Sequence, residues 1–175
     1  MNSFSRRQGF TLLECLITIA ILAIFASLII PSFAVLRGRA QQLHTIDQLE
    51  TAVATARHIA VSRKVSVTLC GRSANHYLGL HWGATDLFCG KSYTYGVGLW
   101  MQSPSGWLLH RLWEWEPILI SNRSGSRSVG EHIVFSERGL AFRNMTWSTC
   151  ANGSNLSLVL NRVGRPIRRA GWGRC

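Results

Sequence analysis

The hydrophobic positions of the first 62 residues indicate one long helix. Leu12 to Ile30 contains no charged residue except Glu14, and as a helix it spans about 28 Å, close to the ~30 Å hydrocarbon thickness of a bilayer. Pro31 follows, and a proline inside a continuing helix kinks it. Apolar residues then recur every three or four positions, which is typical of a helix with one buried face: Leu43, Ile46, Leu49, Val53, Ala56 and Ala60. We therefore predict a helix over 10–62, with residues 12–30 in a membrane and the second half packed on a globular domain.

The pattern changes to that of strands from residue 63 onward. Residues 65–70 alternate as a half-buried strand does. Other predicted strands are 93–101, 106–113, 116–120, 131–137, 139–142 and 155–161. Clusters of Gly, Ser and Asn separate them, and 121–130 has the composition of a long exposed loop. The prediction is an α+β chain, in which the long N-terminal helix packs on a mostly antiparallel β-sheet domain over 63–175.

The charge of the chain narrows the choice of partner. Lys and Arg number 19 against 8 Asp and Glu, a formal net charge of +11. Such an excess favours a polyanionic partner, either nucleic acid or an anionic membrane surface. A basic protein with no specific anion is the alternative that total charge alone leaves open.

The residues before the apolar stretch predict how it lies in a membrane. Arg6 and Arg7 precede it, and no cation follows until Arg37, so the N-terminus should remain cytoplasmic. A cleaved secretory signal peptide is the alternative, but its cleavage site follows a shorter apolar core. Here the small residue at a plausible cleavage site is Gly9, in front of the core, so the core should stay on the mature protein.

The segment RRQGFTLLE, residues 6–14, resembles a type IV prepilin leader. The resemblance implies that residues 1–9 are removed by a prepilin peptidase cutting after Gly9, and that the new N-terminal Phe10 is methylated. It also implies that Glu14 meets the N-terminal amine of a neighbouring pilin during assembly. A carboxylate in a membrane segment generally has such a partner. Snorkelling of Glu14 to the membrane interface is the alternative.

Later segments resemble the FimT/GspH class of minor pilins and pseudopilins. They are SVTLC after the helix, GW before an apolar strand, the Phe135-to-Gly139 FxxxG element and the closing LVLNRVGRPIRR. The class implies the type IV pilin fold and a low-abundance subunit near a filament tip, in contact with other major and minor pilins. Its FimT branch is associated with type IV pili and DNA uptake, and its GspH branch with type II secretion.

Four cysteines lie in the predicted exported domain, where oxidising conditions favour disulfides. Four cysteines allow three pairings, which the sequence does not decide. We favour Cys70–Cys89 and Cys150–Cys175 because each closes a short loop. The fifth, Cys15, lies in the apolar stretch and should act as a small hydrophobe. Since the spacings do not match a zinc site, we expect no metal.

The end of the chain is strongly basic. From Arg138 to Cys175 there are seven arginines and no acidic residue. Arginine suits sequence-independent binding of phosphate groups. DNA-binding FimT-type pilins carry a Gly-Arg-x-Arg motif here; Gly164 and Arg165 match it, but its last position is Ile167. We expect a tethered loop that binds DNA through these residues: Arg162, Gly164, Arg165, Arg168, Arg169 and Arg174. For Trp172, packing on the sheet is favoured over stacking on a base.

No combination of residues indicates an enzyme or a cofactor. The acidic residues form no recognisable pair, and no nucleophile motif is present. The predicted function is that of a minor type IV pilin that binds extracellular DNA for natural transformation. It would lie in the inner membrane, with a periplasmic domain, before assembly and at the pilus tip afterwards. The alternative is a GspH-like pseudopilin, a structural component of a type II secretion filament.

Overall fold

The computed structural model describes residues 11–72, 89–90, 92–104 and 106–175. Its one described α-helix, α1, is an uninterrupted element of 52 residues, Leu12–Arg63, that continues through Pro31. The chain divides into two compact units, Met1–Arg37 and Gly38–Cys175. The continuous helix agrees with the element predicted over 10–62, and residue 10 itself lies outside the described residues.

The first part of α1 is apolar and exposed. Leu12, Leu22 and Phe25 are each more than half exposed, and the other described apolar side chains before Ile30 are exposed as well. By length and composition this stretch can cross a membrane, and none of it is buried within the protein. A helix that presents apolar side chains all round is expected to be buried in lipid or in an assembly.

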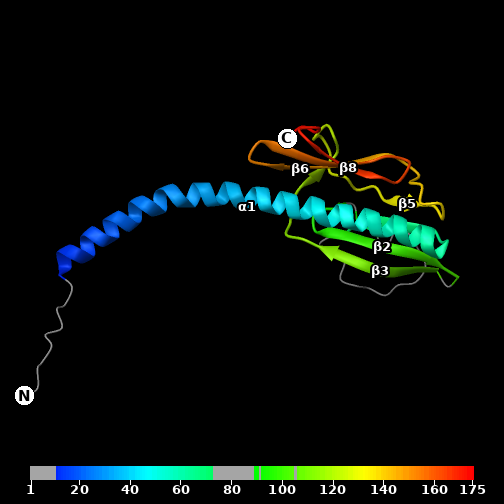
Figure 1. Ribbon diagram of the computed structural model, residues 1–175, viewed down its shortest axis with the longest axis horizontal. Helices are drawn as coiled ribbons and strands as arrows, with labels where there is room; N and C mark the ends of the chain where they lie inside the picture. Colours follow the sequence, from blue (N-terminus) through cyan, green and yellow to red (C-terminus); the bar gives the residue numbers. More distant parts are fainter. Residues whose placement is uncertain (1–10, 73–88, 91, 105) are drawn as a thin grey trace, which may run out of the picture. The chain divides into compact units, whose positions relative to one another are not determined.

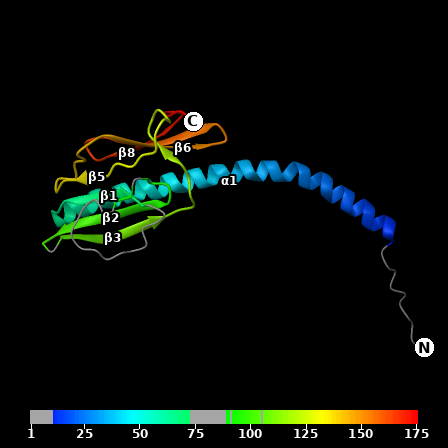
Figure 2. The same ribbon diagram turned by 180° about the vertical axis from the view of Figure 1, so that it is seen from behind.

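The second unit contains two antiparallel sheets of four strands (Figure 1). The first sheet has the order β3-β2-β1-β5, from strands β1 (Val67–Gly71), β2 (Gly96–Ser103), β3 (Gly106–Glu114) and β5 (Ile133–Phe135). The second sheet has the order β4-β6-β7-β8, from strands β4 (Ile120–Ser121), β6 (Met145–Ala151), β7 (Ser154–Leu160) and β8 (Pro166–Ala170). Seen from the front and from behind, the second half of α1 has β2 and β3 on one side and β6 and β8 on the other (Figures 1 and 2).

The second half of α1 supplies one wall of the core. Ile46, Leu49, Val53 and Ala56 are completely buried, as their spacing predicted. Leu43 is the exception, since it is 51% exposed although its neighbour Gln42 is buried. The sheets contribute apolar side chains from both sides: Leu69, Leu99, Ile133, Phe135, Trp147, Leu158 and Leu160. Polar contacts add to this packing, because the Gln42 amide donates to the carbonyl oxygens of Thr149 (2.8 Å) and Ser154 (3.2 Å).

Several strand predictions were wrong in detail. Of the segment 116–120 only Ile120 belongs to a strand, and 139–142 forms a turn with a single bridge between Phe135 and Ala141. Two strands were not predicted, β6 and β8. Strand β8 matters more for function, because it lies inside the segment expected to be an arginine-rich loop.

Candidate nucleic-acid interface

The turn between β7 and β8 holds the first two tail arginines. The Asn161 carbonyl accepts a hydrogen bond from the Gly164 amide (2.9 Å), and the Asn161 side chain accepts one from the Arg165 amide (3.1 Å). Gly164 is buried and has a φ of +77°, a conformation that glycine adopts at little cost. A Cβ there would lie 2.3 Å from the Gly139 carbonyl oxygen. Gly164 thus positions the turn, and the side chains of Arg162 and Arg165 are exposed.

After this turn the tail continues as the edge strand β8. Its residues pair with β7 in antiparallel register, with Arg168 opposite Leu158 and Arg169 opposite Ser157. Pro166 stands at its first position, where a proline costs no ladder hydrogen bond. The expected loop over this stretch is therefore corrected to a strand, whose successive side chains point to opposite faces of the sheet.

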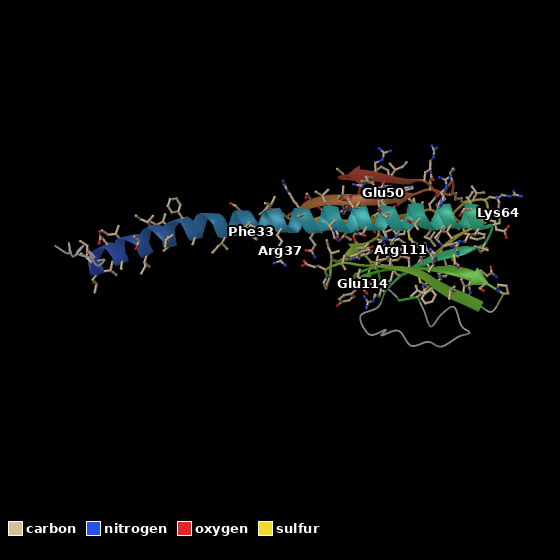
Figure 3. The ribbon with its side chains drawn as sticks, turned by 60° about the horizontal axis from the view of Figure 1, so that its bottom comes forward. Phe33, Arg37, Glu50, Lys64, Arg111 and Glu114 are labelled. Atoms are coloured by element: carbon tan, nitrogen blue, oxygen red, sulfur yellow. A yellow bond between two sulfur atoms is a disulfide. The ribbon has the colours of Figure 1, made fainter. Side chains whose placement is uncertain are left out.

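Arg168 points towards α1 and is ion-paired there. Its guanidinium contacts the carboxylates of Glu50 and Asp47, which lie one helical turn apart on α1. Burial by itself lowers the pKa of Arg168, but the hydrogen bonds and charges of Glu50 and Asp47 together raise it above its ordinary value. Figure 3 labels Glu50 where α1 runs beside the orange and red strands of the second sheet. This arginine fastens the edge strand to the helix, so it is not the outward-facing group that the sequence suggested.

The residues after β8 fold back over the face of the second sheet that points away from α1. Asn155 on β7 accepts hydrogen bonds from the Gly171 amide (3.0 Å) and the Gly173 amide (2.8 Å). A Cβ at Gly173 would lie 2.2 Å from the Ser148 hydroxyl, so a larger residue would have to displace the buried side chains of Ser148 and Asn155. The Cys150–Cys175 disulfide, with a Cα–Cα distance of 5.5 Å, fixes the end of the chain.

The structure has the two disulfides that were favoured, Cys150–Cys175 and Cys70–Cys89. The Cα–Cα distance of the Cys70–Cys89 pair is 5.2 Å, and both distances lie within the normal range for disulfides. Cys15 is a free cysteine, exposed on the apolar part of α1.

The loop over 121–130, which was not predicted to take part in DNA binding, lies beside the C-terminal segment. The Arg174 amide donates a hydrogen bond to the Arg123 carbonyl (3.1 Å), and the Arg123 guanidinium lies over the Trp172 ring, 3.9 Å from its centroid. Figures 1 and 2 show the red C-terminal segment next to the yellow-green loop that contains Arg123. Arg127 is exposed on the same loop. The basic character of this loop could have been recognised from the sequence, since residues 121–130 contain two arginines and no acidic residue.

These arginines form what we call the basic region: Arg123, Arg127, Arg162, Arg165, Arg169 and Arg174. All six side chains are exposed. Within the part of the chain that the structure describes, none of them has an ion pair with an acidic side chain, whereas Arg72, Arg143 and Arg168 each have one. Exposed guanidinium groups without carboxylate partners are available to an external anion, and their planar fork fits both phosphate and carboxylate groups.

The N-terminal site is described only in part, because Gly9 and Phe10 lie outside the described residues. Glu14 caps its own helix: its carboxylate accepts hydrogen bonds from the Thr11 amide (3.0 Å) and hydroxyl (3.2 Å), and the Thr11 hydroxyl accepts one from the Glu14 amide (3.2 Å). This reciprocal arrangement is a capping box. Glu14 therefore has a local partner within one chain, in addition to the neighbouring amine that the resemblance implies.

Comparison with solved structures identifies the fold. The type IV minor pilin FimU of Pseudomonas aeruginosa strain PAO1 matches in two crystal forms, with TM-scores of 0.55 and 0.53 and sequence identities of 16% and 17%. The matches cover 77% and 75% of this chain, and 96% and 98% of the FimU chain. At such identities the likeness concerns the fold. A long apolar N-terminal helix packed on an antiparallel sheet domain is the type IV pilin fold.

Family comparison then identifies the chain more closely. Residues 4–30 match the prokaryotic N-terminal methylation motif, and residues 45–164 match the family described as type II transport protein GspH. The second match covers more than half of the chain, so the protein belongs to the GspH family of minor pilins and pseudopilins. A comparison with curated protein sequences gave no significant match. The apolar helix and the methylation motif fit a membrane-anchored pilin with a periplasmic domain.

Proposed function

We propose that this protein is a FimT-like minor type IV pilin that binds extracellular DNA during natural transformation. The observation that carries the proposal is the basic region, whose six exposed arginines have no acidic partner among the described residues. Four of them lie in the tail and two on the adjoining loop. Guanidinium groups that contact phosphates do not distinguish one base sequence from another, so binding should be independent of sequence.

The geometry supports different roles for the residues of the tail. Arg162, Arg165, Arg169 and Arg174 are exposed and are the proposed phosphate contacts. Gly164 and Arg168 would act as positioning residues, the first by permitting the turn and the second by fastening β8 to α1.

The proposed path to the pilus begins in the inner membrane. With a cytoplasmic N-terminus, the precursor would be cut after Gly9 by a prepilin peptidase and methylated on Phe10. The Glu14 carboxylate would then give up hydrogen bonds of its capping box and bind the N-terminal amine of a neighbouring pilin. Changing Gly9 to Val should leave the precursor uncut in membranes, as judged by its mass. Cleavage after the apolar stretch, found by N-terminal sequencing, would contradict this path.

The DNA-binding proposal is tested by the salt dependence of binding. The full-length protein in a nonionic detergent is titrated into labelled duplexes of two unrelated sequences at several salt concentrations, and fluorescence anisotropy gives the affinity. We expect equal affinities for both sequences and a log–log slope of about −3, because three to four phosphates are neutralised. Binding to only one sequence, or no salt-sensitive binding, would refute the proposal.

The family description favours a second candidate function. In it the protein is a GspH-like pseudopilin, a structural component of a type II secretion filament, and the basic region docks an acidic neighbouring subunit. Failure of the full-length protein to bind DNA at low salt would favour this alternative. Deletion of the gene would then abolish secretion of the system's substrates and leave DNA uptake unchanged.

A further inference from the structure

We propose that Trp172 is a base-stacking subsite that holds single-stranded DNA at the C-terminal end of the basic region. The inference rests on the DNA-binding function proposed above and adds to it a ligand class, unpaired nucleobases. It is carried by three properties of Trp172: its exposure, its contact with Arg123 and the way the flanking backbone is fixed.

The exposure of Trp172 is unlike that of the other tryptophans that the structure describes. Trp113, Trp115 and Trp147 are buried in the core, and Trp100 and Trp107 are half-buried. Trp172 remains 41% exposed even though a guanidinium lies over its ring. The indole is therefore partly covered, in line with the packing favoured from the sequence, and its remaining surface is open to a ligand.

The neighbours of Trp172 suit a nucleic acid. The Arg123 guanidinium, 3.9 Å from the ring centroid, interacts with the aromatic face. Arg174 follows two residues later, and Arg127 lies on the same loop as Arg123; both are exposed. An aromatic ring beside several guanidinium groups is the combination that binds single strands, since bases stack on the ring while phosphates contact the cations.

The backbone around the subsite is already ordered. The Arg174 amide is bonded to the Arg123 carbonyl, and Asn155 holds the amides on both sides of Trp172. On the loop, the Asn122 side chain accepts hydrogen bonds from the Ser124 hydroxyl (3.0 Å) and the Ser126 amide (3.2 Å). A site built in this way loses little conformational entropy when a ligand binds.

The subsite predicts a preference that phosphate contacts alone do not give. Bases in a duplex are stacked on one another and are not available to an indole, whereas those of a single strand are. Stacking is also tolerant of sequence, because every base has an aromatic face. Removal of the indole should therefore weaken binding of single strands by about tenfold and leave duplex binding within about twofold of the parent.

The experiment compares Trp172→Ala with Trp172→Phe in the full-length protein in a nonionic detergent. Anisotropy is measured with labelled oligo(dT) and with a duplex at the same salt concentration. The alanine variant should lose affinity for oligo(dT) only, and the phenylalanine variant should retain most of it. Arg123→Gln should weaken oligo(dT) binding as well, while Arg111→Gln, which removes a guanidinium from beside Trp113 on the first sheet, is the matched control and should not.

A second readout separates stacking from a purely structural role. Oligo(dT) should quench part of the tryptophan fluorescence of the parent and of Trp107→Phe, and that part should be missing in Trp172→Phe. Equal loss of oligo(dT) and duplex binding in the alanine variant, or unchanged quenching without Trp172, would overturn the inference while the DNA-binding function stands. A parent that binds neither form of DNA would overturn the proposed function and this inference together.

Discussion

The two sheets of the pilin domain carry arginines in different electrostatic settings. At the first sheet Arg72 is paired with Glu114, and Arg143 is paired with Glu131. Figure 3 labels Glu114 on β3, together with Arg111, whose guanidinium lies 4.9 Å from the Trp113 ring centroid. The basic region at the second sheet has guanidinium groups without such carboxylate partners among the described residues. The difference teaches that ion pairing has to be considered along with the number of arginines, and we expect the surface with more unpaired guanidinium groups to bind a polyanion more strongly.

Ion pairing also distinguishes two arginines within one strand, Arg168 and Arg169. They are adjacent in the sequence, but the alternation of β8 directs Arg168 to the carboxylates of Asp47 and Glu50 and directs Arg169 to the opposite face. Two adjacent arginines therefore have different surroundings, and substitutions can separate the roles that we propose for them.

The largest expected effect comes from releasing the end of the basic region. Changing Cys150 and Cys175 together to Ser should lower the free energy of unfolding by about 3 kcal/mol, because the bridge restricts the unfolded chain. It should also weaken DNA binding, since Trp172 and Arg174 lose their anchor. Urea unfolding and anisotropy measure the two effects. Cys15→Ser is the control, because Cys15 is a free cysteine; equal stability of the double variant and the parent would contradict the prediction.

The next largest effect concerns the turn that presents Arg162 and Arg165. Changing Gly164 to Ala should destabilise the protein by about 2 kcal/mol, from the positive φ and from the clash with the Gly139 carbonyl. Gly153 is a matched control, with a φ of +74° and nothing within 4 Å of an added Cβ. Gly153→Ala should cost only about 1 kcal/mol. Equal costs in thermal unfolding would show that the close approach does not matter.

The sequence predicted most of what depends on local pattern. The helix, six of the strands at least in part and both disulfides followed from periodicity and loop length. Strand β8 was missed because all but the first of its residues are exposed, so no alternation of buried and polar positions marks it. The strand is held by its pairing with β7 and by ion pairs with α1. One of its partners on α1, Glu50, lies more than a hundred positions away in the sequence.

Strand β6 was missed for a related reason. Ser148 and Thr149 are buried polar residues, which weakens the apolar signal of the strand. Ser148 is bonded to Ser157 on the neighbouring strand β7, and the Thr149 carbonyl is bonded to Gln42, which is distant in the sequence. For the candidate site, the tail arginines could be proposed from the sequence, but the roles proposed for each of them and for Arg123 and Arg127 required the fold.

The smallest expected effect on stability separates Arg168 from Arg169. Arg168→Gln removes exposed ion pairs, so it should destabilise the protein by less than about 1 kcal/mol and leave the salt slope of DNA binding nearly unchanged. Arg169→Gln should leave stability unchanged and make the slope less negative by about one. Chemical unfolding and salt titration of both variants check this. A reduced slope in Arg168→Gln alone would reverse the two assignments.

The most direct test of the account compares charge-matched triple variants at the two sheets. Arg165, Arg169 and Arg174 are changed to Gln in one full-length protein, and Arg72, Arg111 and Arg143 in another, so both lose three positive charges. The account predicts that the first variant remains folded, loses roughly tenfold or more in affinity for every duplex and has a salt slope near zero, while the second keeps most of its slope. Equal losses in the two variants would contradict it, because total charge rather than the basic region would then govern binding.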